Sequence, residues 1–566
     1  MLRKIRSDYI LDITFNHIRN KKKLNIIKYN KILLSRLNIT KEDFVAYIHL
    51  KVFNYNYNLN IDDVDIQGLK LNNLRLGDQG LYNLSKIKFK DLRLLDLSHN
   101  QITDISFLEK LNLEKLQSLD LSSNQISDIN VLERVNLKEL RTLYLADNII
   151  SDINVLAKAK FDKLQILDFG NTHRASGIKK AGNEISNINV LKNVNFKHLK
   201  ALSFSCNNIN NINVLENVNF KELVYLDLSN FSFFNSIQLD ISVLEKVNFE
   251  QLEILYLNDV KALNLSSLAK ANFPNLKALN IGNNEISDIN ILEEMNFKNL
   301  KELYLHNNEI TDIRVLIRVN FENLDILDLS DNKITDIRAL ERVPFKKLKS
   351  LNLTNNNNII NIEILQNTDF KYLKILEIYS IEKPDISYLE KTKFEKLEKL
   401  DLGCNDIEDI SALANANFKK LKELNLQYNL ISDLKVFENV KFDNLEKLNL
   451  FGNRLSDITS LKYITIKGLK ELNLGQNEIT DIEALEKLNL ENLETLKLNS
   501  NEISDISVLE KIKLRKLKML DLRFNSITDI RVLEKVNIKK ILLKGNKFEI
   551  SGLDLLDSIE RICIDD

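Results

Sequence analysis

The sequence is poor in the residues that build disulfide-bonded domains and zinc sites. Among 566 residues there are three cysteines, Cys206, Cys404 and Cys563, which are odd in number and far apart. This spacing gives neither a disulfide framework nor the paired CxxC pattern of a zinc site. A reducing environment fits best. We therefore expect an intracellular protein, located in the cytoplasm or the nucleus.

Long apolar runs and an excess of one charge are also missing. The first residues are basic, but Asp8, Asp12, Asn16 and His17 interrupt any apolar core of a signal peptide. No run of about 18 apolar residues occurs elsewhere, so we expect no membrane-spanning segment. Lys plus Arg (79) nearly balance Asp plus Glu (80), giving a formal charge of -1. Because polyanion binders normally carry a basic excess, nucleic acid is disfavoured as a partner.

Motifs that would indicate catalysis are absent. The six histidines are scattered, and the chain has no HExxH pair, no GxSxG turn and no GxxxxGK[ST] phosphate loop. No nucleophile is paired with a base, so the sequence predicts no enzyme. We also expect no cofactor and no metal. The lack of Trp and the three prolines are typical of a chain encoded by an AT-rich genome.

What the sequence does contain is a repeat. The segments Leu95–Ile105, Leu119–Ile129 and Leu143–Ile153 share the pattern LxLxxNxIxDI, with asparagines 24 residues apart. Counting degenerate copies, the array has about 20 repeats. The asparagine position is occupied by Asn100, Asn124, Asn148, Asn207, Asn284, Asn308, Asn332, Asn356, Asn405, Asn429, Asn453, Asn477, Asn501, Asn525 and Asn546.

Each position of the repeat has a physical reason. Alternating leucines such as Leu119 and Leu121 bury one face of a short strand, while Ser118, Asp120 and Ser122 point outward. The asparagine amide carries donors and acceptors enough to satisfy backbone groups of adjacent turns. Stacked asparagines are therefore predicted to form a buried ladder. No repeat can bury its apolar wedge alone, so stability must come from neighbouring repeats.

The second half of the repeat predicts a turn and a short helix. Ile102 and Ile105 are expected to be buried, and residues 106–109 resemble a capping box that opens a helix. The aspartate between the isoleucines, as in Asp104, recurs once per repeat. Such wide spacing lacks the oxygen clustering of a calcium loop, so local capping of the backbone is the favoured role.

The combined pattern LxxLxLxxNxIxDIxxLexxxFxxL resembles the leucine-rich-repeat family, in the branch of the internalins and the leucine-rich regulatory subunit of protein phosphatase 1. This resemblance implies an α/β leucine-rich-repeat solenoid, a curved horseshoe with parallel β-strands on its concave face and short helices on its convex face. The predicted domains are a helical cap at 1–60, the solenoid at 61–550, and a C-terminal cap with an acidic tail at 551–566. The implied function is a non-catalytic scaffold that binds protein.

The array is irregular in two places, and both are candidate binding sites. Thr172, Phe231, Val260 and Ile381 stand where asparagine is expected. The first two adjoin insertions, one basic and one aromatic, that should emerge at the same edge of the solenoid. Exposed aromatic and arginine side chains often anchor interfaces. Candidate partner-binding residues at this edge are Arg174, Lys179, Lys180, Phe231, Phe233 and Phe234.

The outward strand positions form a second candidate surface. Their mixed, neutral character suits a protein partner better than a phosphate backbone. Strand propensity alone also favours tyrosine at such positions, so the structural and functional interpretations both stay open. The candidate residues are Tyr144, Tyr225, Tyr256, Tyr304, His306 and Tyr379.

Residues 1–50 lie outside the repeat and contain two helical stretches. Their spacing favours a cap that shields the first repeat, which solenoids need. It also resembles an F-box, a segment that docks onto a ubiquitin-ligase adaptor, although the usual Pro and Trp are absent. The sequence therefore leaves two alternatives to a general scaffold: a ubiquitin-ligase substrate receptor and a phosphatase regulatory subunit.

Overall fold

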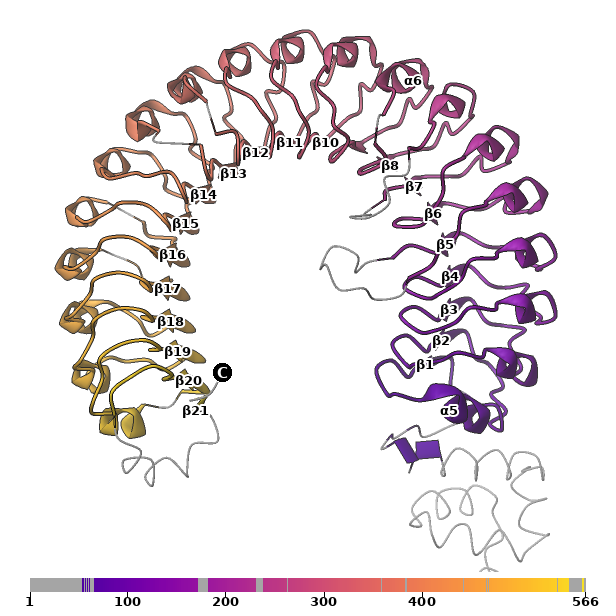
Figure 1. The fold of residues 1–566 in the computed structure, drawn as a ribbon, viewed down its shortest axis with the longest axis horizontal. Helices are drawn as coiled ribbons and strands as arrows, with labels where there is room; N and C mark the ends of the chain where they lie inside the picture. The colour runs from indigo at the N-terminus through magenta and orange to yellow at the C-terminus, as the bar shows by residue number, and fades with distance from the viewer. Residues whose placement is uncertain are drawn as a thin grey trace, which may run out of the picture. The chain divides into compact units, whose positions relative to one another are not determined.

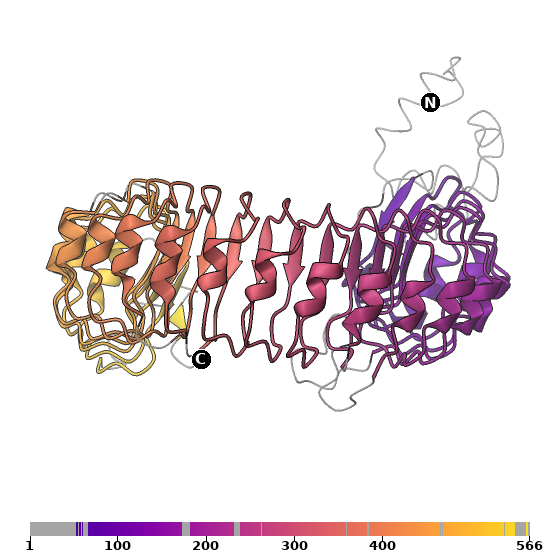
Figure 2. The same cartoon turned by 90° about the horizontal axis from the view of Figure 1, so that it is seen from above.

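The computed structural model divides the chain into two compact units, unit 1 at Met1–Ile237 and unit 2 at Gln238–Asp566. Each unit is described separately. The described residues are 53–54, 56–57, 59, 61, 66–171, 182–230, 238–261, 263–357, 359–381, 384–440, 442–464, 466, 468–536, 538–548 and 562–563. Within each unit, parallel strands line one side and short helices line the other (Figures 1 and 2). We call these sides the strand face and the helix side.

In unit 1 the strands and helices alternate once per repeat. The strands are β1 (Gly68–Lys70), β2 (Leu94–Asp96), β3 (Ser118–Asp120), β4 (Thr142–Tyr144), β5 (Ile166–Asp168), β6 (Ala201–Ser203) and β7 (Tyr225–Asp227). The helices are α5 (Gly77–Leu84) and the 3-10 helices η2 (Ser106–Lys110), η3 (Asn130–Glu133), η4 (Asn154–Ala157), η6 (Asn189–Asn193) and η7 (Asn213–Asn217).

Unit 2 repeats the same alternation. Its strands are β8 (Ile254–Tyr256), β9 (Ala278–Asn280), β10 (Glu302–Tyr304), β11 (Ile326–Asp328), β12 (Ser350–Asn352), β13 (Ile375–Glu377), β14 (Lys399–Asp401), β15 (Glu423–Asn425), β16 (Lys447–Asn449), β17 (Glu471–Asn473), β18 (Thr495–Lys497), β19 (Met519–Asp521), β20 (Lys540–Leu542) and β21 (Ile562–Cys563).

The helices of unit 2 are short. Apart from the α-helix α6 (Leu265–Lys270), the described ones are 3-10 helices: η8 (Ser242–Glu245), η9 (Asn290–Glu294), η10 (Arg314–Ile317), η11 (Arg338–Glu341), η12 (Ile362–Asn367), η13 (Ile386–Lys391), η14 (Ser411–Ala414), η15 (Lys435–Glu438), η16 (Thr459–Tyr463), η17 (Glu483–Lys487), η18 (Ser507–Glu510) and η19 (Arg531–Lys535).

Within each unit the strands pair in parallel, each with the next in sequence, and the repeat sets the register. Leu95 lies beside Leu119, and Leu119 lies beside Leu143. These leucines are fully buried, as is Leu121, which follows its strand. The side chains between them alternate to the strand face, as expected for an extended backbone. The predicted solenoid with parallel strands and short helices is confirmed.

The repeat asparagines lie buried where the chain leaves each strand. Nδ2 of Asn332 donates to the carbonyls of Leu305, Leu329 and Ser330, at 3.0 to 3.1 Å. Its Oδ1 accepts the backbone N–H of Ile310 at 3.0 Å. One side chain thus satisfies backbone groups of its own repeat and of the preceding one. Buried groups of this kind are costly when left without partners.

The basic insertion leaves the ladder continuous, contrary to the placement of Thr172 in the asparagine position. Asn183, on the far side of the insertion, occupies that position: its Oδ1 accepts the N–H of Ile150 at 2.9 Å, and its Nδ2 donates to the carbonyl of Leu145. Asn171 closes the base of the insertion, because its Oδ1 accepts the N–H of Asn183 at 2.8 Å. The ladder does contain an apolar residue at Val260 and at Ile381, whose N–H groups donate to the next asparagine.

The aspartates between the isoleucines cap the helix side, as the sequence analysis favoured. Oδ1 of Asp128 accepts the N–H of Asn130, and Oδ1 of Asp104 accepts the N–H of Ser106, both at 2.7 Å. The predicted capping box at Ser106 is wrong. The hydroxyl of Ser106 donates to Asp104, and the residue before η2, Ile105, provides no side-chain cap.

Both predicted end segments lie largely outside the described residues. Residues 53–54 and 56–57 are helical, and Phe53 is buried with its ring 4.8 Å from that of Tyr57. The F-box-like segment at 1–50 is not described. At the other end, β21 pairs with β20, which adds a strand to the segment interpreted as a cap and acidic tail. Among the described residues, no helix is long and apolar enough to cross a membrane.

We predict that Asn332→Ala destabilises the protein by roughly 3 kcal/mol, because it leaves several buried backbone groups without partners. Urea denaturation of the full chain, followed by circular dichroism, should show a lower midpoint. Asn290→Ala, at an exposed position of η9, is the matched control and should leave the midpoint unchanged. Equal midpoints for the two variants would contradict the role of the ladder.

Candidate functional site

The strand face carries side chains that are not needed for the packing of one repeat against the next. Its candidate residues Tyr144, Tyr225, Tyr256, Tyr304, His306 and Tyr379 are all partly exposed there. The structure brings some of them together: Tyr144 and Tyr225 line one hollow in unit 1. In unit 2, Tyr256 and Tyr304 flank β9, while Tyr379 lies three repeats beyond Tyr304.

The hollow of unit 1 has a volume of about 360 Å³ and lies over β5 and β6. Its floor is made of small side chains, because the repeat of β6 has Ala201, Ser203 and Ser205 at its outward positions. Gly170 also faces it, and a Cβ there would collide with the hydroxyls of Ser203 and Ser205. The walls therefore come from larger neighbouring side chains, namely Tyr144, Asp168, Tyr225 and Asp227.

Two carboxylates in this hollow are shielded from water. Burial raises the pKa of Asp168 and of Asp227, although hydrogen bonds from neighbouring groups oppose the increase. Asp168 accepts the N–H of Gly170 at 2.8 Å, and Asp227 accepts the hydroxyl of Tyr225 at 3.1 Å. The negative charge of Asp227 contributes further to the raised pKa of Asp168. The two groups therefore interact across the hollow.

In unit 2, aromatic rings lie flat against glycines of adjacent repeats. A Cβ on Gly282 would fall 2.5 Å from the ring of His306, and one on Gly403 would fall 2.7 Å from the ring of Tyr379. Gly475 has the same relation to Phe451. Since each pair is 24 residues apart, ring and glycine occupy equivalent positions in successive repeats. The missing side chain leaves room for the ring beside the glycine backbone.

His306 and Tyr379 have additional polar neighbours. Nδ1 of His306 lies 3.7 Å from Oδ2 of Asp328, on the next strand. The Sγ of Cys404 lies 2.7 Å from Oη of Tyr379, and this hydrogen bond, together with burial, raises the pKa of Tyr379 to about 12. The Tyr304 hydroxyl donates to Glu302 at 3.1 Å, and burial raises its pKa. These tyrosines stay neutral near physiological pH.

Sequence reasoning missed two exposed aromatic residues beside this face, Tyr428 and Phe524. Both have positive φ, at 52° and 54°, and both are about half exposed. The same positive φ recurs at Ser123, Asp331 and Ser500, each directly before a repeat asparagine, so this conformation belongs to the turn of the repeat. Tyr428 also meets Phe451 edge-on, with centroids 5.2 Å apart. The signal was readable: Gly452 follows Tyr428 by one repeat, and its absent Cβ makes room for that ring.

The charged residues along the strand edge of unit 2 mostly neutralise one another. Outward positions of successive repeats alternate in sign, and neighbours pair directly: Lys447 with Glu423 at 2.5 Å and Lys470 with Glu446 at 2.6 Å. The ammonium groups of Lys422 and Lys374 hold the pKa of Glu398 at about 2. Exposed ion pairs add little stability. Their alternation instead favours one register of the repeats.

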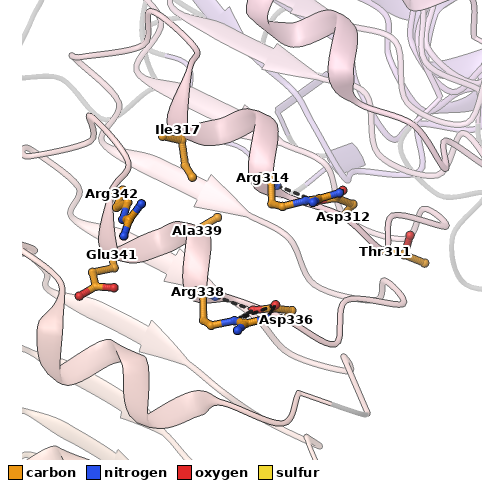
Figure 3. A pocket seen from close by; sticks show the side chains of 9 residues that line it. All are labelled: Thr311, Asp312, Arg314, Ile317, Asp336, Arg338, Ala339, Glu341 and Arg342. Carbon is orange, nitrogen blue, oxygen red and sulfur yellow. Dashed lines mark hydrogen bonds and ion pairs between the residues drawn. The ribbon is translucent and has the colours of Figure 1, made fainter.

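A groove of about 460 Å³ lies between η10 and η11, and it is less suited to a charged partner than the strand face is. Figure 3 shows Arg314 turned onto Asp312 and Arg338 turned onto Asp336, each within its own repeat. Both aspartates have a lowered pKa because of these arginine hydrogen bonds. Each arginine thus already has a carboxylate partner. We therefore place the candidate site on the strand face.

The insertions themselves are not described, so Arg174, Lys179, Lys180, Phe231, Phe233 and Phe234 lie outside the described residues. The base of the first insertion is described. Asn171 stands just before the insertion and Gly182 just after it. Among the described residues, no group of three or more His, Cys, Asp or Glu could hold a metal ion. Neither Cys206 nor Cys404 is part of a disulfide bond.

We predict that Asp227→Asn makes the protein more stable at pH 7 than the wild type. The folded-state pKa of Asp227 is raised, so its contribution to stability is full below the unfolded-state pKa and is lost as pH rises through the folded-state pKa. Thermal unfolding should show the advantage of the variant at pH 7 and its decrease towards pH 4. An advantage that is independent of pH would contradict this electrostatic origin.

Comparisons with known proteins agree with this architecture. The family model described as leucine-rich repeats in two copies matches residues 90–134, 274–318, 443–487, 467–511 and 491–535. A second leucine-rich-repeat model matches 298–359 and 395–455. No curated protein matches the sequence.

Several solved structures resemble the chain. An internalin from Listeria monocytogenes is 30% identical over 54% of this chain and 86% of its own, with a TM-score of 0.46. A leucine-rich-repeat protein from Leptospira interrogans is 22% identical over 71% and 95%, with a TM-score of 0.52. The mouse RP105/MD-1 complex gives 21% identity over 86% and 80%, with a TM-score of 0.58. From its repeats, its solenoid and the two matching family models, this chain belongs to the leucine-rich-repeat family.

Proposed function

We propose that this chain is a non-catalytic scaffold that binds another protein on its strand face. The observation that carries the proposal is the set of partly exposed tyrosine and histidine side chains on the strand face, which the leucine core and the asparagine ladder do not need. Tyrosine offers a large contact area at low entropic cost and is enriched at the centres of interfaces. Repeat proteins of this family act in general as interaction scaffolds, which supports the role.

The face is prepared for binding by its rigidity. Tyr379 is held between a glycine backbone and Cys404, and Tyr304 is held by Glu302. Side chains that are fixed before association lose less entropy on binding. The surrounding outward residues are mostly Asn, Ser, Asp and Glu, so the face combines aromatic anchors with hydrogen-bonding groups. This composition fits a folded or extended polypeptide.

The test is capture by the full chain. We predict that Tyr304→Ser with Tyr379→Ser reduces the recovery of bound proteins about tenfold, the factor that corresponds to about 1.4 kcal/mol. Tyr463→Ser, which removes an exposed tyrosine from η16 on the helix side, is the matched control and should retain them. Quantitative mass spectrometry compares the three samples. Loss in the control but not in the double variant would overturn the proposal.

The insertion edge is the second part of the proposed surface. Its support is the anchoring of the basic insertion by Asn171 and Asn183, at the end of the strand that also contributes Asp168 to the hollow. Deleting residues 174–181 keeps both anchors. We expect this deletion to weaken capture of strand-face partners, and unchanged capture would remove the edge from the site.

Three further predictions made from the sequence stay predictions: adaptor docking, phosphatase regulation and an intracellular location. Adaptor docking through 1–50 and phosphatase regulation have no support among the described residues; co-purification of a ubiquitin-ligase adaptor or of serine/threonine phosphatase activity would test them. We also propose an intracellular location, supported by Cys206 and Cys404, which are not in disulfide bonds. Cell fractionation tests this location.

A further inference from the structure

From β2 to β7 the strand face of unit 1 carries acidic side chains, and its basic residue is Lys70 on β1, which is in register with Asp96. Strand pairing places Asp96, Asp120, Tyr144, Asp168, Ser203 and Asp227 in one continuous row across β2–β7. Around this row, the described strand-face segments 94–99, 118–123, 142–147, 166–171, 201–206 and 225–230 contain no lysine and no arginine. The corresponding segments of unit 2 do contain them, paired with acids.

The hydrogen-bond partners of these acids are neutral groups of their own repeat, together with Ser203 of the next repeat for Asp168. Asp96 accepts the N–H and hydroxyl of Ser98, and Asp120 accepts the N–H of Ser122. Asp96 and Asp120 are directly in register on adjacent strands. Like charges facing each other across a strand pair are unfavourable. Lys70 lies beside Asp96 at one end of the row, whereas Asp168 is in register with the neutral Tyr144 and Ser203, so the repulsion between Asp168 and Asp227 is the part that a cation from outside would relieve.

The hollow supplies a place for such a cation. Asp168 and Asp227 lie at its sides, on strands separated by β6, with Tyr144 and Tyr225 beside them. A guanidinium or ammonium group gains from a carboxylate and from an aromatic face, and it gains more where water is partly excluded. A volume of about 360 Å³ accommodates a long basic side chain.

We infer that the strand face of unit 1 binds a basic polypeptide segment, with a lysine or arginine side chain inserted between Tyr144 and Tyr225. This inference rests on the proposed protein-binding function and names its partner chemistry. Strands lie roughly 4.8 Å apart, so Asp168 and Asp227 are separated by roughly 10 Å, close to one turn of three residues in a polyproline II chain, in which every third side chain lies on the same side. Basic residues about three positions apart therefore match the row.

The experiment titrates the full chain with a fluorescent synthetic peptide in which arginine recurs at every third position among serine and glycine. A peptide with glutamate in place of arginine is the charge control. We expect the arginine peptide to bind, with an affinity that falls as salt rises, and the glutamate peptide not to bind. Asp168→Asn with Asp227→Asn should weaken binding about tenfold or more, while the matched Asp401→Asn variant, in a buried acid of unit 2, should bind as wild type.

The outcomes separate this inference from the function on which it rests. Equal binding by wild type and the double variant, or no binding of the arginine peptide, would overturn the inference. In either case, protein capture that depends on Tyr304 and Tyr379 would still support the scaffold function. Circular dichroism of the double variant checks its fold, which the asparagine oxygens should preserve because they can accept the same hydrogen bonds.

Discussion

The structure depends on the buried amide of one asparagine per repeat. A leucine wedge alone would bury apolar surface in many registers, but each amide bonds to defined backbone groups in its own repeat and in the preceding one. Because a buried backbone group without a partner is costly, a slip between repeats would break several bonds at once. The ladder thereby fixes which residues face outward on every strand, and so it fixes the composition of the strand face.

This constraint also explains how irregular features are accommodated. The insertion after β5 lies between Asn171 and Asn183, so that the chain can leave the repeat and return without disturbing the ladder. Aromatic rings on unit 2 are accommodated in a different way, by a glycine in the adjacent repeat. In both cases the variation is confined to positions that the leucines and amides do not use. The strand face can thus change its chemistry while the fold stays the same.

Much of the fold was readable from the sequence because one period repeats so often. The position of Asn183 was not, since counting five residues from Leu167 reaches Thr172 and does not reveal on which side of the amide an insertion falls. The hollow was missed because Asp168 and Asp227 are 59 residues apart and only strand order brings them near each other. The glycine that accompanies each ring could have been found by comparing equivalent positions one repeat away. Tyr428 escaped notice because it stands just before the asparagine, outside the alternating strand positions.

The most direct test of the strand face as the binding surface is hydroxyl-radical footprinting of the full chain with and without a captured partner. The tyrosines serve as internal probes, since Tyr144, Tyr225 and Tyr304 are on the strand face whereas Tyr82 in α5 and Tyr463 in η16 are on helices. Our account predicts that the partner lowers oxidation of strand-face tyrosines and leaves Tyr82 and Tyr463 unchanged. Protection of the helix tyrosines, with the strand-face tyrosines oxidised as in the free chain, would contradict it.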